Sequence, residues 1–125
     1  MKYTWVAALL VAVASPASAQ EAGKYTGSYI NNQGNNTSLV LDIKSVEGGK
    51  IEGTGQRQGF SQTGLPTQAC SGEFPLTGTV NGAAVEVRSA QKFGRAQDCS
   101  FRLRGTMTGN KIQGKVGGSE VELTR

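Results

Sequence analysis

Histidine is absent from the chain, and with it the side chain that proteins use most often as a general base and as a zinc ligand. Aromatic residues make up only 6% of the sequence, and the single tryptophan is Trp5, near the N-terminus. One apolar run stands out, residues 6–14, and it is too short to cross a bilayer as a helix. These absences argue against histidine-based catalysis and against a helical membrane protein.

The N-terminal segment has the pattern of a cleavable secretory signal. Lys2 is the only charged residue before the apolar run, which leads into the small-residue sequence Ser15-Pro-Ala-Ser-Ala19. A charged start, a short apolar core and a small-x-small exit form the secretory pattern, and the small residues stand at the two positions that a signal peptidase reads. We therefore expect residues 1–19 to be removed during bacterial-type export. Residues 20–125 would then form a single domain, periplasmic or secreted.

Cys70 and Cys99 are the only cysteines. Outside the cytoplasm the default is that such a pair is bonded, and the cross-link stabilises a domain by about 3–4 kcal/mol in the chain-entropy model. A redox-active pair would need close spacing or an activated thiolate. We expect a structural disulfide.

After the signal segment, apolar residues alternate with polar ones and glycine is frequent, which is typical of half-buried strands. The predicted strands are residues 24–30, 37–46, 50–58, 70–80, 83–89, 99–108, 111–116 and 119–124. Eight antiparallel strands with one apolar face remove both exposed edges by closing on themselves. The predicted fold is therefore all-β, an eight-stranded antiparallel up-and-down β-barrel with one disulfide.

The same alternation bears on catalysis, because it turns most strand carboxylates outward: Glu52, Glu86, Glu120 and Glu122. No inward carboxylate pair remains for acid–base chemistry, and no residue spacing matches a metal-binding motif. We predict a protein that is not an enzyme, with no catalytic residues, no metal ligands and no cofactor.

Glycine-containing turns predict how the strands pair. Three two-residue turns bring apolar residues together on one face: Asn81-Gly82, Gly109-Asn110 and Gly117-Gly118. The first of these sets Leu76 opposite Val87. A two-residue turn at Gly48-Gly49 would put Ile51 on the wrong face, so we predict a three-residue turn that begins at Glu47.

Several glycines fall on the inward face near the middle of their strands: Gly27, Gly53, Gly78, Gly105 and Gly114. They would let the strands of a small barrel bend and coil. Alternatively, they would leave space for a ligand at mid-height, since an eight-stranded barrel is either filled or able to hold one small ligand. The sequence leaves both explanations open.

The predicted loops are sorted by length between the two ends of the barrel. Residues 31–36, 59–69 and 90–98 form long loops at one end, where we expect any recognition to occur. The alternative is that the loops only plug the barrel mouth. Because the strands that start at Cys70 and Cys99 flank a third strand, at least one cysteine must leave its ladder for the disulfide to close. We expect it to be Cys70, with the loop 59–69 folded across the mouth.

The candidate binding residues combine aromatic rings with positive charge at the long-loop end: Tyr25, Tyr29, Arg57, Phe60, Arg88, Phe93 and Arg95. Arginine beside aromatic rings suits an anionic or glycan-bearing partner. We expect an unknown small ligand or protein partner here, although solvated loop residues would look the same. The net charge is only +4, and the sequence lacks the dense basic stripe of a nucleic-acid binder, so no nucleic-acid partner is expected. No transmembrane span is expected either.

Other modes of recognition stay open. The loop 59–69, with Gly64-Leu65-Pro66-Thr67 at its tip, would insert into a target if the protein is a secreted inhibitor or a surface-interaction protein. Outward basic residues on two neighbouring strands would bind a polyanion, or simply form salt bridges: Arg102, Arg104, Lys111 and Lys115. An outer-membrane barrel has similar strands, but after residue 19 the chain has too few aromatic residues for membrane girdles.

The segment Gly23-Lys-Tyr-Thr-Gly-Ser-Tyr29, with residues 31–37 behind it, is similar to the opening hairpin of the avidin and streptavidin family. The glycine-punctuated meander resembles that family and the wider calycin barrels over most of residues 20–125. The resemblance implies the barrel and a ligand at its open end. It does not imply biotin, because tryptophans wall the family's biotin pocket and Trp5 lies in the predicted signal peptide.

Overall fold

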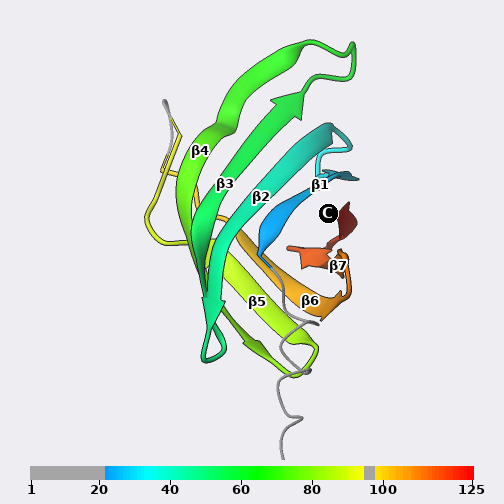
Figure 1. Cartoon of the computed structure of the whole chain (residues 1–125). Coiled ribbons are helices and arrows are strands. Elements are labelled where there is room, and N and C mark those ends of the chain that lie inside the picture. The colour runs from blue at the N-terminus through cyan, green and yellow to red at the C-terminus, as the bar shows by residue number, and fades with distance from the viewer. Residues whose placement is uncertain (1–21, 95–97) are drawn as a thin grey trace, which may run out of the picture.

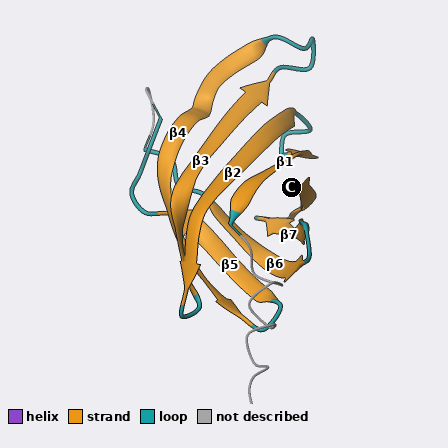
Figure 2. Ribbon diagram, in the orientation of Figure 1, coloured by secondary structure: helices purple, strands orange, loops and turns teal. Residues whose placement is uncertain are grey.

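The computed structural model describes residues 22–94 and 98–125. The predicted signal peptide, residues 1–19, and the predicted site residue Arg95 lie outside the described residues. The described residues form strands, turns and loops (Figure 2). None of their segments is a helix of the length and hydrophobicity that a membrane crossing requires.

Eight antiparallel strands close into one barrel (Figure 1). The strands are β1 (Gly23–Ile30), β2 (Asn36–Glu47), β3 (Lys50–Phe60), β4 (Pro66–Asn81), β5 (Ala84–Ser89), β6 (Arg102–Thr108), β7 (Lys111–Val116) and β8 (Ser119–Thr124). Each strand pairs with the next along the chain, and β8 pairs with β1. The predicted eight-stranded antiparallel barrel is confirmed.

Side chains fill the middle of the barrel. Inward residues alternate with outward ones, and the inward set includes Tyr25, Leu39, Leu41 and Leu103, all with no exposed surface. The ring of Phe74 occupies the space that a Cβ at position 55 would need. The interior at mid-height is therefore a packed core.

The inward glycines allow neighbouring strands to approach closely. A Cβ at Gly53 would meet the backbone oxygen of Asp42 on β2, and a Cβ at Gly78 would meet that of Glu86 on β5. The other inward glycines face a neighbouring strand's backbone in the same way: Gly27, Gly105 and Gly114. Strand coiling accounts for these positions, as the first of the two explanations predicted.

Two hairpin registers agree with the sequence prediction. Met107 pairs with Ile112 across Gly109-Asn110, and Ile112 pairs with Leu123 across Gly117-Gly118. In both hairpins the apolar partners face the core, so periodicity and turn chemistry select the same register.

The predicted register of β4 and β5 is wrong by two residues, because Leu76 pairs with Ser89. The turn consists of Gly82-Ala83 and starts one residue later than predicted. Gly82 has a φ of 63° while Ala83 has no positive φ, which is the pattern of a type II′ turn. A shift of two residues keeps every side chain on its face, so the apolar pattern could not distinguish the two registers.

The hairpin of β2 and β3 also differs from the prediction. Its turn has two residues, Gly48 and Gly49, with φ values of 61° and 82°, as in a type I′ turn. The extra residue predicted for the turn is Lys44 instead, which forms a β-bulge within β2. The bulge returns Ile51 to the inward face, so the predicted extra residue exists but its predicted position was wrong.

The predicted loop 59–69 is mostly a β-hairpin. β3 and β4 stay paired as far as Phe60 and Pro66, so that only residues 61–65 connect them. In Figure 1 this hairpin extends past the turn between β1 and β2. The expectation of a loop folded across the mouth was wrong, because the segment continues the ladder of the barrel wall.

Candidate functional site

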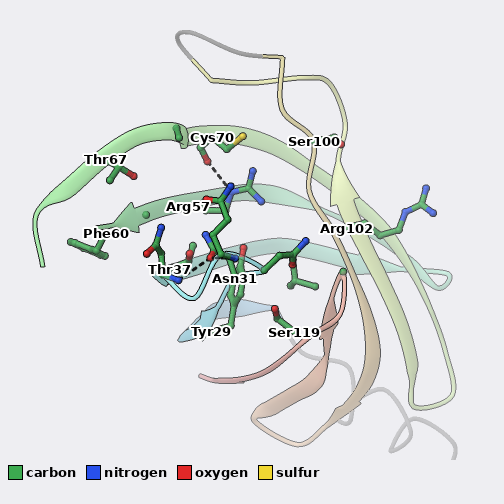
Figure 3. Close-up of a pocket in the computed structure, with 17 residues that line it drawn as sticks. Tyr29, Asn31, Thr37, Arg57, Phe60, Thr67, Cys70, Ser100, Arg102 and Ser119 are labelled. Carbon is green, nitrogen blue, oxygen red and sulfur yellow. Dashed lines mark hydrogen bonds between the residues drawn. The ribbon is translucent and has the colours of Figure 1, made fainter. Parts of the chain in front are cut away.

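Four connections lie at one end of the barrel, which we call the open end: residues 31–35, 61–65, the described parts of 90–101, and 117–118. A pocket of about 570 Å³ lies here, between the projecting β3–β4 hairpin and the ends of β1, β2 and β8. Its lining is rich in uncharged polar side chains, including Tyr29, Asn31, Asn35, Thr37, Thr67 and Ser119. Figure 3 shows the residues around the pocket, with Arg57 near the centre of the group.

Arg57 places a positive charge inside this pocket. It is opposite the buried Leu39 in the β2–β3 ladder, so both side chains point inward. Its Nε donates a 2.8 Å hydrogen bond to the backbone oxygen of Cys70, drawn as a dashed line in Figure 3. The guanidinium carbon lies 4.9 Å from the ring centre of Phe93. These two contacts fix the half-buried guanidinium group in one orientation.

Aromatic packing joins Arg57 to the barrel core. The ring centre of Phe93 is 4.4 Å from that of Phe74, which is 5.3 Å from that of Phe101. All three phenylalanines are buried. Arg57 therefore lies at the boundary between the packed core and the polar pocket.

The disulfide between Cys70 and Cys99 is present, with the two Cα atoms 5.5 Å apart. Cys70 lies in a bulge of β4 in which residues 68–71 stand opposite the single residue Gln58 of β3. Its φ of 52° makes Cys70 the one non-glycine residue with a positive φ in the described part of the chain. The expectation that Cys70 leaves its ladder is confirmed.

Side-chain hydrogen bonds hold this bulge. The hydroxyl of Ser71 accepts a 3.0 Å bond from the N–H of Gly59 and donates a 2.9 Å bond to the oxygen of Thr67. Nε2 of Gln58 donates to the same Thr67 oxygen at 2.8 Å. The bulge therefore presents the Cys70 carbonyl to Arg57 in a defined position.

The disulfide is also connected to Arg57 through Phe93. Phe93 and Cys99 exchange two backbone hydrogen bonds, of 3.0 and 2.8 Å, in an isolated β-bridge. One cysteine therefore supplies the carbonyl that binds Arg57, and the other is paired with the aromatic residue against which Arg57 packs. The cross-link stabilises the orientation of Arg57 as well as the fold.

The β1–β2 connection presents hydrogen-bond donors to the pocket. Oδ1 of Asn31 accepts bonds of 2.9 Å from the N–H groups of both Gln33 and Asn35, which close the turn. Since its oxygen is used in this way, Asn31 offers a ligand its Nδ2–H groups.

The pocket is positively charged. Its described lining contains Arg57 and Arg102 and no acidic residue. Arg102 is paired with Glu86, at 3.4 Å. Arg57 forms no ion pair with any residue in the ranges 22–94 and 98–125. An unneutralised arginine in a polar pocket can bind an oxyanion by charge and by hydrogen bonds.

The structure brings four of the predicted binding residues together: Tyr29, Arg57, Phe60 and Phe93. Two others lie elsewhere. Tyr25 is fully buried in the core. Arg88 is exposed on the outer face of β5, opposite Arg102.

Sequence reasoning missed several pocket residues: Asn31, Asn35, Thr37, Thr67 and Ser119. Thr37 could have been found by alternation, because it lies two residues before Leu39 on the inward face and is only 4% exposed. Thr67 carried no such signal, because its segment had been assigned to a loop.

The basic strand face is mostly paired. Arg102 and Arg104 share one oxygen of Glu86, at 3.4 and 3.3 Å, and Lys111 lies 2.9 Å from Glu122. These pairs are exposed, so each is worth roughly 0–1 kcal/mol. Their arrangement is that of an ordinary salt-bridged surface.

No family model matches the chain, and no curated protein or solved structure was found to be similar to it. The resemblance to the avidin family therefore stays a prediction.

Proposed function

We propose that this protein is an exported, non-catalytic binding module that holds a small ligand in the open-end pocket. The observation that carries the proposal is the pocket of about 570 Å³ around a fixed, half-buried arginine. Pockets for small molecules typically enclose about 300–1,000 Å³ and contain a few placed polar groups. The core beneath is packed, so a ligand at the open end would lie above the core and not within it.

The lining favours binding over catalysis. Among its described residues there is no aspartate, glutamate, lysine or histidine to act as a general base. The one cysteine in the lining, Cys70, is bonded to Cys99 and so has no thiolate. Hydroxyl and amide groups around one arginine can orient a ligand without reacting with it.

Native mass spectrometry of the protein purified from its own host tests the proposal. We expect a bound small molecule that is released on unfolding. Thr67→Trp should abolish the bound mass, because Thr67 lines the pocket and an indole would fill it. Thr79→Trp is the control, since Thr79 is exposed on the same strand far from this pocket. Equal ligand in both variants would contradict the proposal.

A separate observation supports a second function, that of a secreted inhibitor or surface-interaction protein. At the tip of the β3–β4 hairpin, Leu65 is 65% exposed. The tip is closed by a 2.8 Å bond from the N–H of Ser61 to the oxygen of Leu65. An ordered hairpin with an apolar residue at its tip suits insertion into a partner protein.

This second function is tested by a photo-crosslinking residue at position 65, with one at Asn110 as the control at the other end of the barrel. If the hairpin inserts into a partner, position 65 crosslinks to a single protein in the host extract and position 110 does not. Identical products from both positions would exclude a dedicated role for the hairpin.

A further inference from the structure

The half-buried Arg57 differs from two arginines of the outer surface in its ion pairing. On the outer surface, the exposed Arg102 and Arg104 share the carboxylate of Glu86. In the pocket, the half-buried Arg57 has no carboxylate partner among the described residues. Removing a guanidinium group from water costs free energy unless an anion or several acceptors replace the water.

The contacts of Arg57 leave a defined part of the group available. Nε is engaged by the Cys70 carbonyl, and one face of the guanidinium packs against Phe93. The two terminal amino groups, Nη1 and Nη2, have no hydrogen-bond partner among the described residues. Together they form a planar pair of parallel donors, which matches the two oxygens of a carboxylate.

We propose that the ligand of the open-end pocket is a small polar carboxylate, whose carboxylate group is bound by Nη1 and Nη2 of Arg57. This inference rests on the proposed function of the pocket and specifies its ligand class. Among the described lining residues Arg57 is the one cation without an ion-pair partner, and a single positive charge fits a monoanion. A phosphate dianion would require further cations, and the other arginine of the described lining, Arg102, is already paired with Glu86.

The rest of the lining determines the rest of the ligand. Asn31 offers Nδ2–H donors, while Tyr29, Thr37 and Ser119 carry hydroxyls that can donate or accept. Phe60 contributes a partly buried ring. This lining fits a carboxylate with a hydroxylated or amide-bearing body, of the kind found in sugar acids and acylated amino acids.

Acetate and acetamide make a matched pair of probes, because they have similar size and shape but differ in charge. They are titrated into ¹⁵N-labelled protein at constant ionic strength while the Nε–H signal of Arg57 is recorded. We expect acetate to shift this signal until it saturates. Its dissociation constant should be at least 10-fold lower than that of acetamide, and lower than that of inorganic phosphate. Glucuronate should bind more tightly than acetate. Glucuronamide, which lacks the negative charge, should bind more weakly than glucuronate.

Three variants assign the preference to Arg57. The Arg57 Nε–H signal is absent from the position-57 variants, so their binding is read from the backbone amide signals of the lining residues Asn31 and Thr67, calibrated first in the unsubstituted protein. Arg57→Gln should abolish the discrimination between acetate and acetamide. Arg57→Lys should keep the charge but lose the paired donors. We therefore expect it to retain less than a third of the preference for acetate over acetamide. Arg104→Gln is the control, because Arg104 shares Glu86 with Arg102 but does not line the pocket. A backbone amide spectrum of each variant checks that the barrel is intact.

The outcomes separate this inference from the proposed function. Acetate that leaves the Arg57 signal unchanged, or equal binding of both probes, overturns the inference. So does an acetate preference that survives in folded Arg57→Gln. A neutral ligand that co-purifies with the protein and is lost in Thr67→Trp would overturn the inference while leaving the proposed function intact. If no ligand co-purifies and acetate has no effect, both are overturned.

Discussion

The backbone oxygen of Cys70 accepts a 2.8 Å hydrogen bond from Nε of Arg57, which links the disulfide directly to the charge in the pocket. Cys70 reaches this position with a φ of 52°, a conformation that is uncommon outside glycine. The backbone is thus placed in a sparsely populated region at the point where it orients a functional group, a pattern seen at binding sites.

Removal of the disulfide should weaken both stability and anion binding. In Cys99→Ser, we expect the free energy of unfolding to fall by about 3–4 kcal/mol, because a cross-link over a sequence separation of 29 residues is lost. Denaturant titration measures this change, and the Nε–H signal of Arg57 reports its orientation. If that signal and acetate binding are both unchanged, the Ser71 and Gln58 hydrogen bonds alone hold the bulge.

Ser71→Ala should destabilise the β4 bulge. The substitution removes a buried hydroxyl that bonds both Gly59 and Thr67, so we expect a loss of about 1–3 kcal/mol in the free energy of unfolding. Ser28→Ala is the control, since Ser28 is exposed on β1 and should change stability by less than about 0.5 kcal/mol. Equal effects in urea titrations would show that the bulge is held by the disulfide alone.

Gly53→Ala tests the close approach of β3 to β2. The added Cβ would meet the backbone oxygen of Asp42, and we expect a cost of about 1–3 kcal/mol or more. Gly118→Ala is a suitable control, because a Cβ there meets nothing within 4 Å and Gly118 has no positive φ. Thermal unfolding of the two variants gives the comparison. A tolerated Gly53→Ala would mean that the strands can separate without loss of stability.

Substitutions in the β4–β5 turn distinguish the register predicted from the sequence from the observed one. In the observed turn only Gly82 has a positive φ, so Gly82→Ala should cost about 1–2 kcal/mol. Asn81→Ala should cost less than about 0.5 kcal/mol, because Asn81 is an exposed strand residue. The predicted Asn81-Gly82 turn would require positive φ at both residues, and comparable losses in both variants would support it.

The fold could be predicted because a barrel wall has one apolar and one polar face, so alternation marks each strand. The same signal failed in the β3–β4 extension, where residues 59–69 show no alternation. The extension projects past the packed core, with most of its residues partly or fully exposed on both faces. A strand without a buried face has no apolar periodicity to read.

The site was predictable in part for a related reason. Arg57 shares the parity of the inward Ile51, and Arg88 shares the parity of outward Glu86, so alternation alone separates them. The depth of a side chain along the barrel was harder to predict, because alternation does not distinguish an inward tyrosine in the core from one in the pocket. Tyr25 and Tyr29 occupy these two levels on one strand.

Phe93→Leu tests whether aromatic packing orients the charge in the pocket. Leucine retains much of the apolar contact with Phe74 but removes the ring that lies 4.9 Å from the guanidinium carbon of Arg57. The cation–π contact contributes about 0.5–2 kcal/mol, and without it the terminal amino groups lose a fixed direction. We expect the preference for acetate over acetamide to fall several-fold.

Phe101→Leu is the matched control for this substitution. Phe101 packs against Phe74 at 5.3 Å between ring centres and is likewise buried, but the ring in cation–π contact with Arg57 is that of Phe93. The two variants should lose similar free energy of unfolding, because each removes part of one buried ring. Only Phe93→Leu should change the acetate preference. If both variants change it equally, general loosening of the core is the cause, and Phe93 has no specific role in orienting Arg57.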